Sequence, residues 1–572
     1  MHVVLLRMAA LLLLNCLIVV LASNVAELKS SPPPEVATSQ ATFVGRLLND
    51  DFVIDDDADG AGSSPVESFL GIPFAKPPVG ARRFMMPQKP DNNRSDQHVQ
   101  RADSFAPHCV QPAIGISALN RHNTSEDCLY LNVFRRAGTR RGDLKAVVVL
   151  IHGGGFSSGG TSDPYMSGAP LAALGDLVVV SISYRLGIFG FIDTDEGNDT
   201  STNLGLHDQV RALEWVHEHI DDFGGDPGRV TLMGISAGSI SIAALVMSPM
   251  TRSRGLFHSV IMNTGVISSG VAARSDVTAR RIREIARKVD CPTDKNMVDC
   301  LRGQDAERLS DLSYDPENYS PIRTFHPTLD GQFLPRRAEA DIRENAANYA
   351  KVRMMIGYNR DEGSLFVRGQ MSSAADPDLT TEAKFLDWCA KLSRLYKFSL
   401  NFNSSDVRQT IIDAYLSRYP TKLLAATRFV GDGAYKCPMN AFVDSYSKHN
   451  NDNVYMYRFD RMLRDTYFGV DPKKFGVFHF CSHVSLSGSL LSLRHVDAAD
   501  KQFTRDTVRM VADFARGHEP AFRAVRWPKF DQSRQVLSLS DTPTLLDGLP
   551  HEENCRRVFS AYEADLLVRN EL

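Results

Sequence analysis

The amino-acid sequence predicts an α/β protein with a large, mostly parallel central sheet flanked by helices. Three observations lead to this expectation: continuous apolar runs recur along the chain, segments with helical spacing separate them, and one strand–turn–helix segment carries a G-x-S-x-G pattern. Continuous apolar runs are typical of strands buried on both faces. We expect such strands at 146–151, 177–184, 229–233, 259–262, 352–357 and 454–459.

Helices are expected between these strands. The clearest pattern places Val210, Leu213, Val216 and Ile220 on one face at spacings of three and four. Two short strands are expected earlier in the chain, and the Pro- and Gly-rich segment 71–80 reads as a loop. The further helices are expected at 278–289, 407–416, 440–447 and 506–516, and the two early strands at 41–49 and 67–74.

Length and composition are those of an ordinary globular protein. The chain has 572 residues, of which 43% are hydrophobic and 23% charged, so one large α/β domain or two domains would fit. The net charge of -4 is small and gives no reason to expect nucleic acid or an anionic membrane as a partner.

The N-terminus predicts entry into the secretory pathway. Residues 1–23 combine Arg7, an apolar run and the small residues Ala22 and Ser23, which is typical of a cleaved signal peptide. A membrane anchor is the alternative, but the run is short for a span and a polar, Pro-rich stretch follows it. We therefore expect a flexible segment at 24–40, and no later stretch is apolar and long enough to span a membrane.

Secretion changes how asparagines and cysteines are interpreted. Cys16 leaves with the signal peptide, so eight cysteines remain in an oxidising compartment. Cys291 and Cys300 could close a short loop, and Cys109 and Cys128 a longer one, although spacing does not fix the connectivity. N-glycosylation sequons occur at Asn93, Asn123, Asn198, Asn318 and Asn403.

The G-x-S-x-G pattern at 234–238 predicts a nucleophile elbow, with Ser236 as the nucleophile. An apolar strand-like run precedes it, a helix-compatible run follows it, and Gly234 and Gly238 would let strand and helix approach closely. An earlier segment, His152-Gly-Gly-Gly-Phe156, follows another expected strand and could present backbone N–H groups to an oxyanion. No Lys-Ser/Thr step follows it, so a phosphate-binding loop is not indicated.

Several segments resemble the landmarks of the type-B carboxylesterase and cholinesterase family. They lie in the family's order and together span roughly residue 43 to the C-terminus. The resemblance implies an α/β-hydrolase fold in a single domain at 41–572 and a serine esterase that needs no cofactor or metal. The segments are 71–80, 125–134 (SEDCLYLNVF), 152–156, 203–209 and 223–227.

The family resemblance also implies the remaining roles. Glu362, in the step Asn-Arg-Asp-Glu-Gly-Ser, corresponds to the family's acid, and His479, after Gly-Val-Phe, to its base. The base would take the Ser236 proton and return it to the leaving alcohol. The implied oxyanion donors are the N–H groups of Gly154, Gly155 and Ala237. The implied disulfides are Cys109 with Cys128, Cys291 with Cys300, and Cys437 with Cys555, which leaves Cys389 and Cys481 unpaired.

The chain departs from the family pattern near the expected site. Ile235 replaces the glutamate that usually precedes the nucleophile, and 110–124 lacks the tryptophan that holds choline in cholinesterases. Both changes favour neutral, apolar esters over acylcholines. After His479 the sequence Phe-Cys-Ser-His483 is unusual, so His483 is an alternative base, and Asn263-Thr-Gly265 stands where the family has Gln-Ser-Gly.

The expected partner is a small-molecule ester, and a homodimer remains open. Secretion is the expected destination, with the endoplasmic-reticulum lumen as the alternative because the tail at 569–572 resembles the x-x-Glu-Leu tails of lumenal carboxylesterases. The competing function is that of a catalytically weak or inactive, neuroligin-like adhesion or scaffold member of the family.

Overall fold

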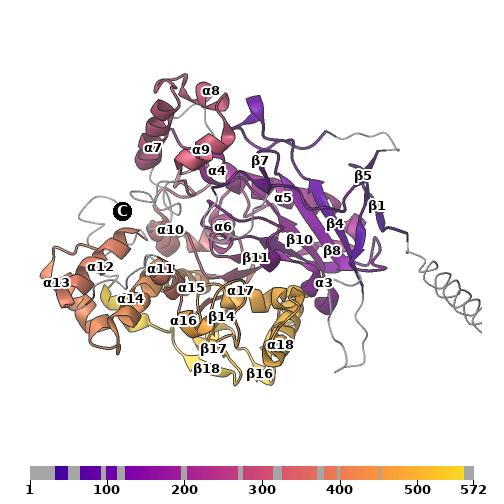
Figure 1. Ribbon diagram of the computed structural model, residues 1–572. Helices are drawn as coiled ribbons and strands as arrows, with labels where there is room; N and C mark the ends of the chain where they lie inside the picture. Colours follow the sequence, from indigo (N-terminus) through magenta and orange to yellow (C-terminus); the bar gives the residue numbers. More distant parts are fainter. Residues whose placement is uncertain are drawn as a thin grey trace, which may run out of the picture.

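The computed structural model describes most of the chain and places a large sheet between layers of helices (Figure 1). The expected signal peptide at 1–23 and the sequons at Asn93, Asn198 and Asn318 lie outside the described residues. The described residues are 32–48, 65–91, 98–112, 123–194, 202–267, 275–313, 325–369, 379, 381–395, 400–449 and 453–558.

The central sheet has 11 strands, and parallel pairing runs without interruption from β17 to β10. Antiparallel strands close both edges. In spatial order the strands are β18 (Thr544–Asp547), β17 (Gln535–Leu539), β14 (Val454–Phe459), β13 (Arg353–Asn359), β12 (Ser259–Asn263), β11 (Gly225–Ile235), β9 (Lys145–Ile151), β10 (Val178–Ile182), β8 (Tyr130–Arg136), β4 (Val66–Pro73) and β3 (Arg46–Leu48).

The six apolar runs of the sequence form strands β9 to β14, so the prediction of an α/β fold with a mainly parallel sheet is confirmed. Side chains of β9 alternate between two apolar cores: Val147 and Val149 face one, whereas Val148 and Leu150 face the other. Three helices pack into the first core: α5 (Leu204–His219), α6 (Ala237–Met247) and α15 (Cys437–His449). Three others pack into the second core: α3 (Ala169–Gly175), α17 (Cys481–Leu486) and α18 (Ala498–Ala515).

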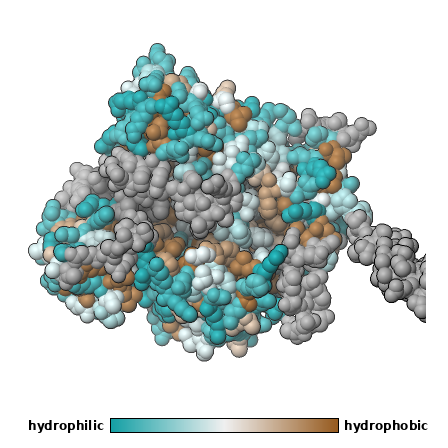
Figure 2. Space-filling view, in the orientation of Figure 1, coloured by the Kyte–Doolittle hydropathy of each residue, from teal (hydrophilic) through white to brown (hydrophobic). Residues whose placement is uncertain are grey.

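A third core lies apart from the sheet, where α12, α13 and α14 pack on one another at one end of the molecule (Figure 1). Mostly hydrophilic residues cover α7 to α9 in Figure 2, and α7 turns Ile282 and Ile285 inward. The remaining helices are α4 (Gly187–Phe191), α7 (Ser275–Lys288), α8 (Met297–Arg302), α9 (Ala306–Ser313), α10 (Ala338–Asn345), α11 (Ser364–Gly369), α12 (Glu382–Leu395), α13 (Ser405–Ile411), α14 (Lys422–Gly431), α16 (Pro472–Phe475) and α19 (Phe530–Ser533).

The five helices expected from the sequence are all present, and each begins earlier than its pattern indicated. The segment expected at 407–416 starts as α13 and continues as the π-helix η5 (Ile412–Leu416). A second π-helix, η6 (Asp432–Lys436), joins α14 to α15. The first turns of α7 and α13 are mostly polar, and apolar periodicity does not show such turns because it marks only the residues that face the core.

Two expectations at the N-terminal end need correction. Residues 35–37, assigned to a flexible segment, form β1 and pair with β2 (Thr42–Val44), which also pairs with β5 (Val99–Arg101). The expected strand 67–74 is present as β4 (Val66–Pro73), so the expected loop 71–80 begins only after Pro73. A bulge between Phe69 and Ile72, with Gly71 at φ 73°, lets the strand tolerate this glycine.

All three implied disulfides are present, and Cys389 and Cys481 are buried and unpaired. Among the described residues, no helix is long and apolar enough to cross a membrane. The sequon asparagines Asn123 and Asn403 are both exposed.

We expect the Cys437–Cys555 disulfide to contribute more stability than Cys291–Cys300. The first closes a loop with a sequence separation of 118 and the second one of 9. Loop-closure entropy then predicts that the free energy of unfolding falls by about 5 kcal/mol when Cys437–Cys555 is removed and by about 2.6 kcal/mol when Cys291–Cys300 is removed. Paired Cys→Ala variants compared by thermal unfolding test this order, and an equal or reversed loss of melting temperature would contradict it.

Candidate active site

The turn that carries Ser236 is a tight strand-to-helix junction. β11 ends at Ile235, α6 begins at Ala237, and Ser236 between them has φ 55° and ψ -119°. A Cβ on Gly234 would lie 2.5 Å from the carbonyl carbon of Gly238, so this approach requires glycine. Ser236 therefore lies at the carboxyl end of β11 in a backbone conformation that is rare for a non-glycine residue.

The Ser236 backbone is fixed from both sides. Its N–H donates to the carbonyl of Asn263 at 3.0 Å, and its own carbonyl accepts the N–H of Ile240 at 2.9 Å. The first bond ties the elbow to the carboxyl end of the neighbouring strand β12. In open α/β sheets, that edge is where ligands bind.

Glu362 and His479 form a buried acid–base pair. Glu362 Oε2 lies 2.5 Å from His479 Nδ1, and the relative exposures of the residues are 0% and 5%. Burial alone would raise the pKa of Glu362, but the His479 ring and its hydrogen bonds hold that pKa below its ordinary value. The carboxylate is therefore ionised at neutral pH.

The second carboxylate oxygen of Glu362 accepts three hydrogen bonds. They come from Thr264 Oγ1 at 2.6 Å, the Asn359 backbone N–H at 2.6 Å and Asn359 Nδ2 at 2.8 Å. Asn359 Oδ1 in turn accepts the N–H of Ser482 at 2.8 Å, three residues after His479. Asn359 thus joins the turn of Glu362 to the segment of His479.

Thr264 connects the acid to the elbow. It follows Asn263, whose carbonyl accepts the Ser236 N–H, and its hydroxyl donates to Glu362. Its φ of 64° is strained for a β-branched residue. The structure therefore brings the segments of Ser236, Glu362 and His479 together at the carboxyl ends of β11 to β13. His479 Nε2 is buried and has no hydrogen-bond partner within the described residues.

The turn His152–Phe156 lies against the elbow. A Cβ on Gly153 would be 3.2 Å from Ser236 Cβ, and Gly154 and Gly155 have φ 108° and 61°. A Cβ on Gly154 would meet the Ser158 carbonyl at 2.0 Å, so glycine is required there. Ala237 is the first residue of α6, so its N–H has no acceptor within the helix.

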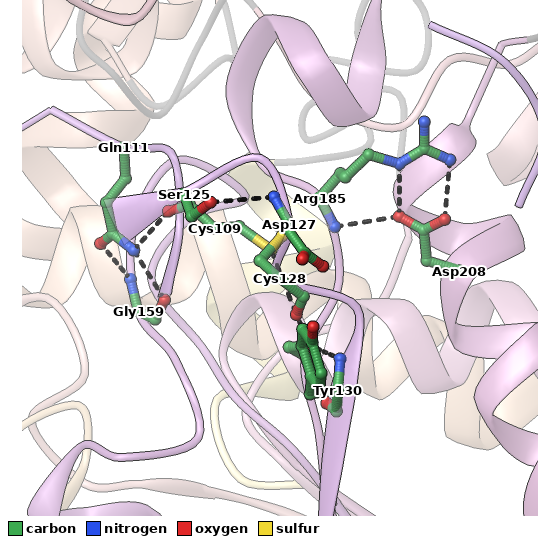
Figure 3. The surroundings of a disulfide bond; sticks show 10 residues. Cys109, Gln111, Ser125, Asp127, Cys128, Tyr130, Gly159, Arg185 and Asp208 are labelled. Atoms are coloured by element: carbon green, nitrogen blue, oxygen red, sulfur yellow. Dashed lines mark hydrogen bonds and ion pairs between the residues drawn. A yellow bond between two sulfur atoms is a disulfide. The ribbon is translucent and has the colours of Figure 1, made fainter. Parts of the chain in front are cut away.

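A disulfide-anchored loop braces this turn (Figure 3). Gln111, two residues after Cys109, exchanges two hydrogen bonds with the Gly159 backbone at 3.0 and 2.9 Å. A Cβ on Gly159 would lie 2.6 Å from the Gly153 carbonyl, so the braced residue touches the glycine turn itself. On the other side, the His152 ring stacks on Tyr184 at 4.3 Å.

His483, the alternative base, has different surroundings. Its ring is buried, Nε2 lies 3.1 Å from the Tyr165 carbonyl, and within the described residues it has no carboxylate partner. Burial lowers its pKa to about 4. Nearby, burial also raises the pKa of the Cys481 thiol. Neither group has the ionic contact that Glu362 gives His479.

Ile235 is buried at 2% exposure in the apolar core on the α17 and α18 side of the sheet. Its position next to the elbow therefore carries no charge and no polar atom. Within the described residues, no cluster of His, Cys, Asp and Glu could hold a metal ion.

Sequence reasoning missed the supporting residues of the acid–base pair. Asn359 lies three positions before Glu362, but an asparagine after a strand carries no specific signal. Thr264 was noted only as a departure from a family motif. Tyr435 and Phe366 pack on the His479 ring with centroid distances of 4.7 and 5.0 Å, and no sequence pattern indicated them.

Comparisons with known proteins agree with this fold. The model of the "Carboxylesterase family" matches residues 38–558. The para-nitrobenzyl esterase of Bacillus subtilis is 30% identical, covering 87% of this chain and 96% of its own. The acetylcholinesterase of Danio rerio is 31% identical, and the match covers 86% of this chain and 83% of the relative. The liver carboxylesterase 1F of Rattus norvegicus is 30% identical, and the match covers 94% of this chain and 95% of the relative.

The sheet and the strand–serine–helix elbow define the protein as an α/β hydrolase. The chain belongs to the carboxylesterase family and is a carboxylic ester hydrolase.

A substitution of His483 separates the two candidate bases. We expect His483→Phe to keep esterase kcat/KM within about threefold, because no described carboxylate contacts this ring, and to lower the melting temperature through the lost bond to Tyr165. His479→Phe is the matched variant and should lose activity by a factor of about 10⁴ or more. Loss of activity in a folded His483→Phe enzyme with activity retained in His479→Phe would reverse the assignment.

Proposed function

We propose that this protein hydrolyses neutral, apolar carboxylic esters through an acyl-enzyme formed on Ser236. His479 is the general base, and Glu362 orients its ring and stabilises its cation. The observation that carries the proposal is the Glu362–His479 contact of 2.5 Å, since it fixes Nδ1 as the protonated nitrogen and leaves Nε2 as the proton acceptor.

In the first half of the reaction, Ser236 Oγ attacks the ester carbonyl as His479 Nε2 takes its proton. The resulting oxyanion would be bound by the N–H groups of Gly154, Gly155 and Ala237. His479 then gives the proton to the leaving alcohol, and water repeats the sequence on the acyl-enzyme. Catalytic hydrogen bonds often tighten only when substrate is bound, so an unpaired Nε2 is compatible with this role.

The preference for neutral esters rests on two features of the sequence. Ile235 places an apolar side chain beside the elbow, where an acidic residue would attract a cationic substrate. The segment 110–124 contains no tryptophan to bind a quaternary ammonium group by a cation–π contact.

We further propose secretion after removal of residues 1–23, with the single domain at 41–572 and glycosylation at the five sequons. Three disulfides support an oxidising compartment, and retention in the endoplasmic reticulum is the alternative. Hydrolysis itself needs no metal or cofactor. A homodimer is compatible with the proposal but no described feature requires it.

The competing proposal is a catalytically weak or inactive, neuroligin-like adhesion or scaffold protein. The unusual sequence after His479 motivates it. The presence of a serine at the elbow and of an ionised carboxylate on the histidine favours the enzyme.

We expect a fluorophosphonate probe to label the mature protein at Ser236. Ser236→Ala should abolish labelling and lower hydrolysis of a short-chain aryl ester by a factor of about 10⁴ or more. The exposed Ser533→Ala is the control and should behave as the wild type. Absence of both labelling and hydrolysis in folded wild-type protein would favour the adhesion proposal.

Substrate charge provides a separate test. We expect kcat/KM for butyrylcholine to be about tenfold or more below that for 3,3-dimethylbutyl butyrate, its uncharged analogue of the same shape, because Ile235 replaces an acidic residue beside the elbow and the segment 110–124 contains no tryptophan. The ratio should not change between low and high salt if the charge meets no acidic side chain. A preference for butyrylcholine would contradict the argument from Ile235.

A further inference from the structure

The π-helix η6 (Asp432–Lys436) lies directly beside the acid–base pair. The Glu362 turn packs on the helix that leads into η6: a Cβ on Gly363 would lie 2.1 Å from the Thr427 carbonyl and 2.7 Å from the Gly431 nitrogen. From η6 itself, Tyr435 packs on the His479 ring at 4.7 Å. Both members of the pair therefore touch the segment formed by α14 and η6.

This segment contains a fully buried ion pair. Lys436 Nζ lies 3.2 Å from Asp432 Oδ1, and both side chains have 0% exposure. Asp432 Oδ2 also accepts the Tyr415 hydroxyl at 3.1 Å, and His551 Nδ1 lies 3.6 Å from Oδ1. Two charges are expensive to bury, and apolar side chains of similar volume usually give equal or greater stability. Fold stability alone therefore does not explain this pair.

The charges around Lys436 include the proposed catalytic acid. Burial lowers the pKa of Lys436, whereas the carboxylates of Asp432 and Glu362 oppose that shift. The Lys436 charge is the main reason why the pKa of His551 falls to about 4, so His551 is neutral at pH 7. A further cation near this pair, Arg428, is bound to Asp361 at 2.8 Å.

A π-helix provides a reason for this placement. The continuous helix from Lys422 to His449 is α-helical on both sides of η6. One extra residue in a helix turn rotates the following side chains by about 100° relative to an unbroken α-helix. Such insertions occur frequently at functional sites.

We propose that Asp432 and Lys436 are positioning residues for the Glu362–His479 pair. Lys436 stabilises the ionised Glu362 carboxylate, and Asp432 holds Lys436 in place. Tyr435, which lies on the same π-helix and packs on the His479 ring, keeps the imidazole plane fixed. This inference rests on the proposed function, because it assumes that Glu362 and His479 act as acid and base.

The sign of the electrostatic effect follows from the charges. Lys436 follows Tyr435, which packs on the His479 ring, so its charge disfavours a second positive charge on the imidazole. Lys436→Met removes this repulsion. The acid-side midpoint of the kcat/KM profile therefore moves to higher pH in Lys436→Met. Removal of the negative charge of Asp432 acts on this midpoint in the opposite direction.

The experiment compares pH profiles of ester hydrolysis in the full-length secreted protein. We expect Lys436→Met to raise the acid-side midpoint of kcat/KM by about half a pH unit or more, and Asp432→Asn not to raise it. The double variant should lie between the two single variants. Tyr415→Phe, which removes one hydrogen bond to Asp432 without changing a charge, should leave the midpoint within about 0.2 units.

Lys448→Met is the matched control. Lys448 pairs with Asp444 at the same i,i+4 spacing, but its side chain is 63% exposed, so its loss should change neither the midpoint nor the melting temperature. If Lys436→Met does not fold, Asp432→Asn and the double variant carry the test. Melting temperatures identify variants that are only destabilised.

Equal midpoints in all folded variants, or shifts of the same sign in Lys436→Met and Asp432→Asn, would overturn the positioning role. The second result would indicate altered packing. A wild-type protein without hydrolysis or fluorophosphonate labelling would instead refute the proposed function. The two failures are therefore distinguishable.

Discussion

The Glu362 carboxylate is the constraint on which the rest of the site depends. An ionised carboxylate with 0% exposure is strongly destabilising unless hydrogen bonds replace the water that it has lost. Here one oxygen is bound to His479 and the other to Thr264 and Asn359. The polar groups that satisfy the charge come from different strand ends, so meeting this electrostatic requirement also assembles the site.

Backbone strain at the site also depends on hydrogen bonds between neighbouring strands. Ser236 and Thr264 both have positive φ, and each is held by hydrogen bonds that cross between strands. The strain is tolerated because β11, β12 and β13 form the middle of an extensive parallel sheet with apolar cores on both faces. The rigid sheet therefore supports a conformation that an isolated turn would not keep.

The sequence predicted those parts of the structure that repeat a local pattern. Apolar runs predicted strands β9 to β14, and the strand–glycine–serine–glycine–helix pattern predicted the Ser236 elbow. The family resemblance supplied what no local pattern contains: the Glu362–His479 contact and the disulfide pairing. Edge strands such as β18 were missed because their exposed residues do not produce an apolar run.

Other features could not be predicted because they depend on contacts between distant segments. Asn359 matters through Ser482, which lies 123 positions away, and Lys436 is unusual only because folding buries it completely. The strand at 35–37 was assigned to a flexible segment because Pro-rich neighbours conceal a three-residue pairing. In each case the residue type was visible, but its partner was not.

The central claim is that Ser236, His479 and the glycine turn act on one carbonyl carbon. A crystal structure of the protein inactivated by a phosphonate ester tests it most directly, because phosphorus imitates that carbon in its tetrahedral state. We expect a covalent bond from Ser236 Oγ to phosphorus, with the phosphoryl oxygen about 2.7–3.1 Å from the N–H groups of Gly154, Gly155 and Ala237. His479 Nε2 should face Ser236 Oγ. An adduct on another residue, or a phosphoryl oxygen turned toward solvent, would contradict it.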